Sequence, residues 1–178
     1  MHMIGKRIAA AAGATALAAA LLGGTATAQA APTEAGRHCV YSADTQKTTC
    51  YATFTELTAS LTGGKVTNAP AQPNTAAVED LSANAIGSTV HAILYQDTNN
   101  TGNSFVLVSS AGCGSYHWVN LTAFNDRVSA AWVENMCGIR LWDGSNLTSD
   151  RAGYYELLSP GGNVPLWIND KASSVEFW

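Results

Sequence analysis

The sequence predicts an all-β protein with two Greek-key motifs, preceded by a small extension made of a disulfide-linked hairpin and a helix. Three observations favour this fold class. From Thr89 onward, short β-prone runs alternate with turns rich in Gly, Asn, Asp and Ser. No helical periodicity separates these runs, which indicates a sandwich or barrel. The same stretch also repeats itself after about 45 residues, as expected for two copies of one four-stranded unit.

Residues 1–30 match an export signal. Lys6-Arg7 gives a positive start, an apolar run follows over Ile8–Leu22, and Ala28-Gln29-Ala30 fits the small-residue pattern at which signal peptidase cuts. The apolar run is too short for a membrane span, and no later run is longer. We therefore expect a secreted, extracellular protein.

Removal of the signal leaves 148 of the 178 residues, which is enough for one domain with a single core. The mature chain carries 13 acidic and seven basic residues, because two of the nine basic residues lie in the signal. Its net charge is thus about −6, and it has no basic cluster. This charge argues against nucleic acid or an anionic membrane as a partner.

Residues 31–66 predict a hairpin and a short helix. The β-prone runs His38–Tyr41 and Thr48–Ala52 flank a polar turn, which suits a hairpin. Thr53–Glu56 fits a capping box that starts a helix, and Gly63-Gly64 would end it.

Residues 67–88 are interpreted as a linker. The stretch from Lys65 to about Ala77 is rich in Pro, Ala, Asn and Thr, which is typical of a connecting segment. A short helix over about Thr75–Asn84 is a weaker alternative for part of this segment. The β-domain itself is expected to span residues 89–178.

The internal repeat consists of three matched blocks in the same order. A single four-stranded unit would leave an apolar face in water, so we expect the two copies to pack together. The matched blocks are Leu94-Tyr95-Gln96-Asp97 with Leu141-Trp142-Asp143-Gly144, Ser104–Leu107 with Tyr154–Leu157, and Phe124–Ser129 with Ile168–Ser173.

The repeated Asn-Asp-x-x-Ser block predicts a metal site. Ca²⁺ takes six to eight oxygen ligands from carboxylates, carbonyls, hydroxyls and water. One block offers too few oxygens, but two blocks related by a pseudo-twofold axis can each complete the other's site. The alternative is that Asn-Asp only forms a turn at the start of a strand. That interpretation is favoured for a single copy, whereas two copies at matching positions favour calcium.

Residues 90–178 resemble a βγ-crystallin domain. In that family each motif opens with a Tyr-x(6)-Gly corner and carries N/D-N/D-x-x-S/T-S near its end. The first motif has Tyr95 and Gly102 at the corner positions. The paired calcium blocks are Asn125–Ala130 and Asn169–Ser174.

The chain departs from the family pattern at two positions, and the resemblance implies a set of calcium ligands. The first block has Ala130 where Ser is usual, and the corner Gly of the second motif is displaced to Ser149 or Gly153. The implied ligands are the hydroxyls of Ser129 and Ser173, the carbonyls of Gln96, Arg127, Asp143 and Lys171, and the side chains of Asp126 and Asp170.

Four cysteines, Cys39, Cys50, Cys113 and Cys137, lie in the exported part, and their even number favours two disulfides. Proximity in the sequence favours Cys39–Cys50 and Cys113–Cys137, while the other two connectivities stay open. The segments Gly112–Trp118 and Asn135–Trp142 are also similar to secreted actinobacterial members grouped with the Streptomyces metalloproteinase inhibitor family. That narrower resemblance implies the Cys113–Cys137 pair.

We expect a secreted, non-enzymatic, calcium-binding module. The sequence contains no G-x-S-x-G, H-E-x-x-H or phosphate-loop motif, and its histidines are scattered. One alternative is a metallopeptidase inhibitor with a loop held by Cys113–Cys137. Another is an adaptor or toxin-associated subunit of an extracellular antibacterial assembly, docking through residues 31–88. In each case the partner is another secreted protein, such as a peptidase or an assembly subunit.

The second half carries a heavy aromatic load, and most of its Trp and Tyr side chains are expected to be core or corner residues. The tract Ser115–Trp118 is the exception. An exposed aromatic loop is a common binding surface, so this tract is a candidate contact with a partner.

Overall fold

The computed structural model describes residues 38–149 and 153–178. The expected export signal, residues 1–30, lies outside the described residues. Among the described residues no helix is long and apolar enough to cross a membrane. The elements are β1 (His38–Ser42), β2 (Lys47–Tyr51), α1 (Phe54–Leu61), α2 (Thr75–Asn84), β3 (Thr89–Asp97), β4 (Thr101–Ser109), β5 (His117–Asn120), η1 (Thr122–Phe124), β6 (Ala130–Val133), β7 (Gly138–Trp142), η2 (Ser145–Leu147), β8 (Tyr154–Leu158), β9 (Gly161–Asn163) and β10 (Ser174–Phe177).

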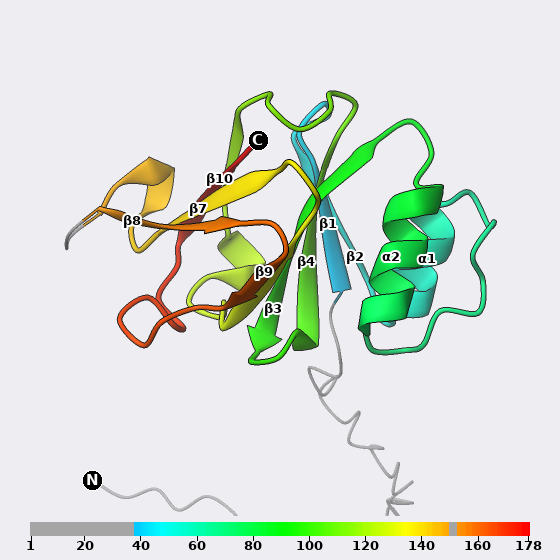
Figure 1. Ribbon diagram of the computed structural model, residues 1–178, viewed down its shortest axis with the longest axis horizontal. Coiled ribbons are helices and arrows are strands. Elements are labelled where there is room, and N and C mark those ends of the chain that lie inside the picture. Colours follow the sequence, from blue (N-terminus) through cyan, green and yellow to red (C-terminus); the bar gives the residue numbers. More distant parts are fainter. Residues whose placement is uncertain (1–37, 150–152) are drawn as a thin grey trace, which may run out of the picture. The chain divides into compact units, whose positions relative to one another are not determined.

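The described strands form two sheets, and each Greek key contributes one strand to the sheet that contains most of the other key. Sheet 1 has the order β2-β1-β4-β3-β6-β9, and sheet 2 has the order β5-β10-β7-β8. The first key is β3–β6 and the second is β7–β10. Their third strands are exchanged, because β9 pairs with β6 in sheet 1 and β5 pairs with β10 in sheet 2. The predicted all-β fold with two Greek keys is confirmed, as Figure 1 shows.

The N-terminal hairpin is part of sheet 1. β1 pairs with β2, and the directly opposed Cys39 and Cys50 form a disulfide. On its other side β1 runs parallel to β4, and His38 Nδ1 lies 2.9 Å from the Ser104 hydroxyl oxygen. Main-chain pairing therefore crosses the boundary that the sequence placed at residue 89.

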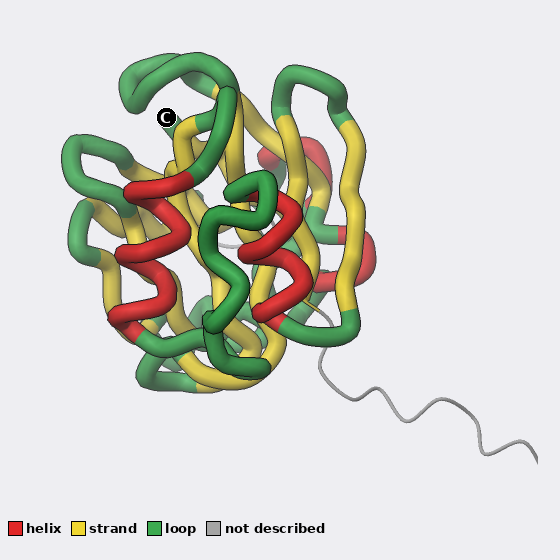
Figure 2. Tube along the Cα trace, turned by 90° about the vertical axis from the view of Figure 1, so that its right-hand side faces the viewer, coloured by secondary structure: helices red, strands yellow, loops and turns green. Residues whose placement is uncertain are grey.

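Two helices cover the outer face of sheet 1, the face turned away from sheet 2 (Figures 1 and 2). Thr53 caps α1 by accepting a hydrogen bond from the Glu56 amide, as predicted. Glu56 accepts from the Ala52 amide, one residue before the cap, rather than from the Thr53 amide that a capping box would use. α2 lies inside the segment interpreted as a linker, and its Val78 and Leu81 are buried. Residues 75–84 are therefore a packed helix, which was the weaker of the two sequence interpretations, rather than a connecting loop.

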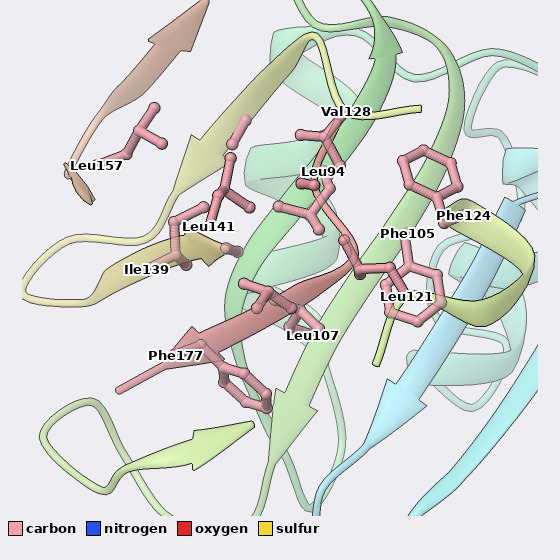
Figure 3. Close-up of a cluster of buried hydrophobic side chains, with 14 of the residues drawn as sticks. Leu94, Phe105, Leu107, Leu121, Phe124, Val128, Ile139, Leu141, Leu157 and Phe177 are labelled. Atoms are coloured by element: carbon pink, nitrogen blue, oxygen red, sulfur yellow. The ribbon is translucent and has the colours of Figure 1, made fainter. Parts of the chain in front are cut away.

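Sheet 1 separates two apolar cores. Alternate residues of β4 enter them: Phe105 and Leu107 face sheet 2, whereas Val106 and Val108 face the helices. Figure 3 shows the core between the sheets, to which both keys contribute. Because β3 and β4 are buried on both faces, their sequences read as continuous apolar runs rather than alternating ones.

Sheet 2 carries an aromatic ladder on its outer face, contrary to the expectation that most Trp and Tyr of this half are core or corner residues. None of the Trp side chains is fully buried. The Arg140 guanidinium lies 4.6 Å from the Tyr154 ring centroid and 4.7 Å from that of Trp178. It also forms ion pairs with Glu156 and Glu176. Stacking on a paired arginine lets large rings stabilise a solvated sheet face.

Candidate metal centre

The two Asn-Asp-x-x-Ser blocks occupy equivalent loops, each leading into the fourth strand of its key. The Ser129 amide donates to the Tyr95 carbonyl at 2.9 Å, and the Ser173 amide donates to the Trp142 carbonyl at 2.8 Å. Each block is thus fixed against the first strand of its own key. The serine and the residue that follows the corner aromatic are brought together in both copies.

The blocks also bind each other across the pseudo-twofold axis. The Asp126 amide donates to the Ala172 carbonyl at 3.0 Å, and the Asp170 amide donates to the Val128 carbonyl at 3.1 Å. Both aspartates have a left-handed backbone, with φ of 55° and 54°. Few residues other than Gly adopt this conformation, and Asn and Asp are enriched among them. The face-to-face arrangement expected from the repeat is therefore present.

The asparagine before each aspartate orients its carboxylate. Asn125 donates to Asp126 Oδ2 at 2.6 Å, and Asn169 donates to Asp170 Oδ2 at 2.9 Å. In each aspartate the other carboxylate oxygen, Oδ1, lies outside this contact.

The corners repeat as well. Asn99 and Asn100 in the first key and Asn146 and Leu147 in the second all have positive φ. The spacing from Tyr95 to Gly102 equals that from Trp142 to Ser149, so Ser149 stands in the corner glycine's position. Of the two expected alternatives, Ser149 or Gly153, the corner geometry favours Ser149.

An open pocket gathers the predicted ligands of the first site. The Ser129 hydroxyl donates to Asp170 Oδ1 at 3.0 Å, so the aspartate of one block reaches the serine of the other. No equivalent bond between Ser173 and Asp126 is present among the described residues, which makes the two sites unequal. The pocket is lined by Gln96, Asp97, Thr98, Asp126, Arg127, Ser129 and Asp170.

Sequence reasoning missed Asp97. This carboxylate lies against Gly102, where a Cβ would come within 2.4 Å of Asp97 Oδ2. The signal was available, because Asp97 belongs to the first repeated block and directly follows the predicted ligand Gln96. Its counterpart in the second key is Gly144, so this extra carboxylate is specific to the first site.

The predicted ligands of the second site come from equivalent elements. Asp143 follows the corner aromatic Trp142, and Lys171 and Ser173 belong to the second block. The Lys171 ammonium turns back to the Trp167 carbonyl at 3.4 Å.

The donor set of the first site fits a hard cation. Its carboxylates, hydroxyls and peptide carbonyls are the oxygen ligands that Ca²⁺ takes in proteins. Asp97, Asp126 and Asp170 do not form a tight cluster, so carbonyls and water would have to supply part of the coordination shell. Among the described residues, one group of three potential His, Cys or carboxylate ligands lies within 4.8 Å: His91, Cys113 and Cys137. Its two sulfurs form a disulfide and so offer no thiolate.

Comparison with known proteins gives similarity to solved structures alone. No family model and no curated protein matches the chain. A βγ-crystallin domain from Clostridium beijerinckii is 20% identical over 49% of this chain and 97% of its own, with a TM-score of 0.41. A βγ-crystallin domain from Flavobacterium johnsoniae is 22% identical over 49% of this chain and 92% of its own, with a TM-score of 0.39. The N-terminal domain of Protein S is 16% identical over 49% of this chain and 94% of its own, with a TM-score of 0.37. The fold assignment rests on the strand order and the exchanged third strands.

Proposed function

We propose that the protein is a secreted, non-enzymatic, calcium-binding module whose fold is stabilised by the ion. The observation that carries this proposal is the bond from Ser129 of one block to Asp170 of the other, inside a pocket lined by oxygen donors. Calcium would supply a positive charge shared by both keys. An ion that binds only the native state raises the free energy of unfolding.

At the first site, side chains and main-chain carbonyls would both coordinate the ion. Asp170 and Ser129 would offer side-chain oxygens, while Gln96 and Arg127 would offer their carbonyls. Asn169 holds the Asp170 carboxylate in place through its Oδ2 atom. At the second site the corresponding residues are Asp126, Ser173, Asp143 and Lys171.

Calcium titration by calorimetry tests this assignment. We expect Asp170→Asn and Ser129→Ala each to weaken binding at the first site by at least about tenfold, equivalent to ~1.4 kcal/mol. Asp80→Asn, an exposed aspartate on α2, is the matched control and should bind as the native protein does. Calcium affinity and stoichiometry that are unchanged in both site variants would refute the assignment.

A metallopeptidase inhibitor is the second candidate function. The Cys113–Cys137 disulfide joins the β4–β5 loop to the β6–β7 loop, as the sequence predicted. Beside it, Tyr116 is 62% exposed and Met136 is 84% exposed. A restrained loop with exposed side chains is suited to a peptidase cleft. Titration of a thermolysin-like enzyme decides the question, and full peptidase activity at micromolar protein would rule this function out.

The adaptor alternative needs a different experiment from simple truncation. The described part of the proposed docking segment, residues 38–88, supplies two strands of sheet 1 and the helices over it. Its removal would expose a core, so any loss of a partner could reflect unfolding. Substitution of exposed residues such as Glu79 and Asp80 keeps the fold and still tests for docking.

A further inference from the structure

A second pocket lies on the opposite edge of sheet 2 from β8, between the N-terminal hairpin and the edge strand β5. It is an open groove of about 400 Å³, within the range of about 300–1,000 Å³ that is usual for small-molecule sites. The hairpin supplies one wall and β5 with η1 supplies the other. The lining residues used below are Tyr41, Gln46, Thr48, Trp118, Asn120 and Thr122.

The hairpin is what creates this groove. On the pseudo-equivalent side of the molecule the exchanged strand is β9, which is the last strand of sheet 1 with no hairpin beside it. The two sides are otherwise alike. Asn120 pairs with Asn146 through two hydrogen bonds of 2.9 and 2.7 Å, and Asn163 pairs with Asn99 in the same way. The extension has therefore added a concave site that two Greek keys alone do not form.

The lining is polar but uncharged. It contains no acidic or basic side chain, in contrast to the metal pocket with its three aspartates and one arginine. A charged ligand would find no countercharge here. The chemistry of the groove therefore selects a neutral ligand that forms hydrogen bonds.

Several polar groups of the groove have no partner in the described protein. Tyr41 is 8% exposed, its ring packs edge-on against Phe177, and its hydroxyl forms no hydrogen bond with a described residue. The side chains of Gln46, Thr48 and Thr122 likewise form none. A hydroxyl at the tip of a largely buried ring usually has a partner, so water or a ligand in the groove must supply it.

Trp118 completes the lining with an apolar surface. It is 48% exposed and makes no ring contact in the described part of the chain. Other exposed aromatics of sheet 2 already have ring partners, since Tyr116 stacks on Trp178 and the Tyr154 ring lies tilted against Trp142. The indole faces of Trp118 are thus available to a ligand.

We propose that this groove binds a neutral saccharide. A sugar ring presents C–H groups on its faces and hydroxyls on its rim, which match an open indole face beside unpaired hydroxyl and amide groups. The site shares no residue with the metal pocket, so the proposal stands apart from calcium binding.

An extended peptide adding to the free edge of β5 is the competing occupant. Such a peptide would gain main-chain hydrogen bonds, but its backbone would supply no defined partner for the unpaired hydroxyls of Tyr41, Thr48 and Thr122. The side-chain chemistry favours the saccharide, and the peptide becomes an outcome of the test.

The test screens the mature, disulfide-intact protein on an array of neutral glycans, followed by calorimetry with soluble tetrasaccharides of glucose and N-acetylglucosamine. We expect at least one glycan class to bind, in calcium and in chelator alike. Trp118→Ala should lower its affinity at least tenfold. Tyr41→Phe, which removes one hydroxyl and keeps the packing, should lower it several-fold. Trp167→Ala, at an exposed tryptophan outside the groove, is the control and should bind normally.

Absence of binding across the neutral glycans would overturn the proposal. So would glycan binding that is unchanged in both the Trp118 and Tyr41 variants. Selection of extended peptides whose binding is lost in Trp118→Ala, with no glycan bound, would assign the groove to a peptide instead. Because binding is measured with and without calcium, a failure here is distinct from a failure of the calcium proposal.

Discussion

Asp126 and Asp170 combine two properties that are separable by substitution. Their backbone is left-handed, and each carboxylate accepts a hydrogen bond from the asparagine before it, while that of Asp170 also accepts one from Ser129 of the opposite block. Asparagine keeps the conformation and removes the charge, glycine keeps the backbone and removes the side chain, and alanine opposes the backbone conformation. A left-handed residue with a Cβ costs about 1–2 kcal/mol when no local hydrogen bond offsets it.

The backbone contribution is measured in a chelator, where metal binding plays no part. We predict that Asp126→Ala unfolds with a free energy about 1 kcal/mol lower than Asp126→Gly, because only alanine opposes the positive φ. Urea denaturation of the two variants gives this difference. Equal stability of the two variants would show that the loop relaxes to another conformation.

Two buried histidines predict how stability depends on pH. His38 and His91 are fully buried, and burial lowers the pKa of each below its usual value of 6.5. The folded state thus favours the neutral rings, and the unfolded chain binds protons first as the pH falls. Their contribution is complete above pH 6.5 and is lost as the pH falls from there toward the lowered values.

Melting temperatures between pH 8 and pH 5 in a chelator check this prediction. We expect a decline that begins near pH 6.5, the unperturbed histidine pKa. In the double variant His38→Gln, His91→Gln the decline should be smaller. A melting temperature that is constant or rises toward pH 5 would contradict the prediction.

The helix α2 shows why sequence analysis supports some elements only weakly. Three of its residues are buried, Ala77, Val78 and Leu81, and its surroundings are rich in Pro, Ala and Asn. Packing on sheet 1 stabilises this helix more than its own pattern does. The sequence signal for a layer outside sheet 1 lies in β4 instead. A continuous apolar run such as Phe105–Val108 indicates burial on both faces, which requires a layer outside the sheet.

Packing of α2 gives an element-scale prediction. Leu81 is fully buried among the residues of the second core, so Leu81→Ala should lower the free energy of unfolding by about 2–5 kcal/mol. Glu79→Ala on the exposed face of the same helix should change it by less than about 0.5 kcal/mol. Urea denaturation of both variants measures the two changes in the free energy of unfolding. A small effect at Leu81 would mean that α2 contributes little to the folded unit.

At the scale of the whole molecule, a nearly symmetric pair of Greek keys carries asymmetric additions. The repeat blocks predicted the paired keys and the facing loops, because those features depend on local sequence copied twice. The parallel pairing of β1 with β4 and the groove beside β5 could not be predicted. They arise from contacts between segments far apart in the chain, and no motif marks them.

The half-buried tryptophans of sheet 2 follow the same logic. Trp142, at the end of β7, packs against Tyr154, and Trp178, just after β10, lies against Arg140, which pairs with two glutamates from neighbouring strands. Composition alone favours burial of such residues. Only the register of β7, β8 and β10 shows how they assemble on a solvated face.

The most direct test of the central claim is the melting temperature of the mature protein in excess calcium and in chelator. Calcium at 100 times its dissociation constant adds about 2.7 kcal/mol, which should raise the melting temperature by about 5–10 °C for a domain of this size. The same melting temperature in both conditions would contradict the account.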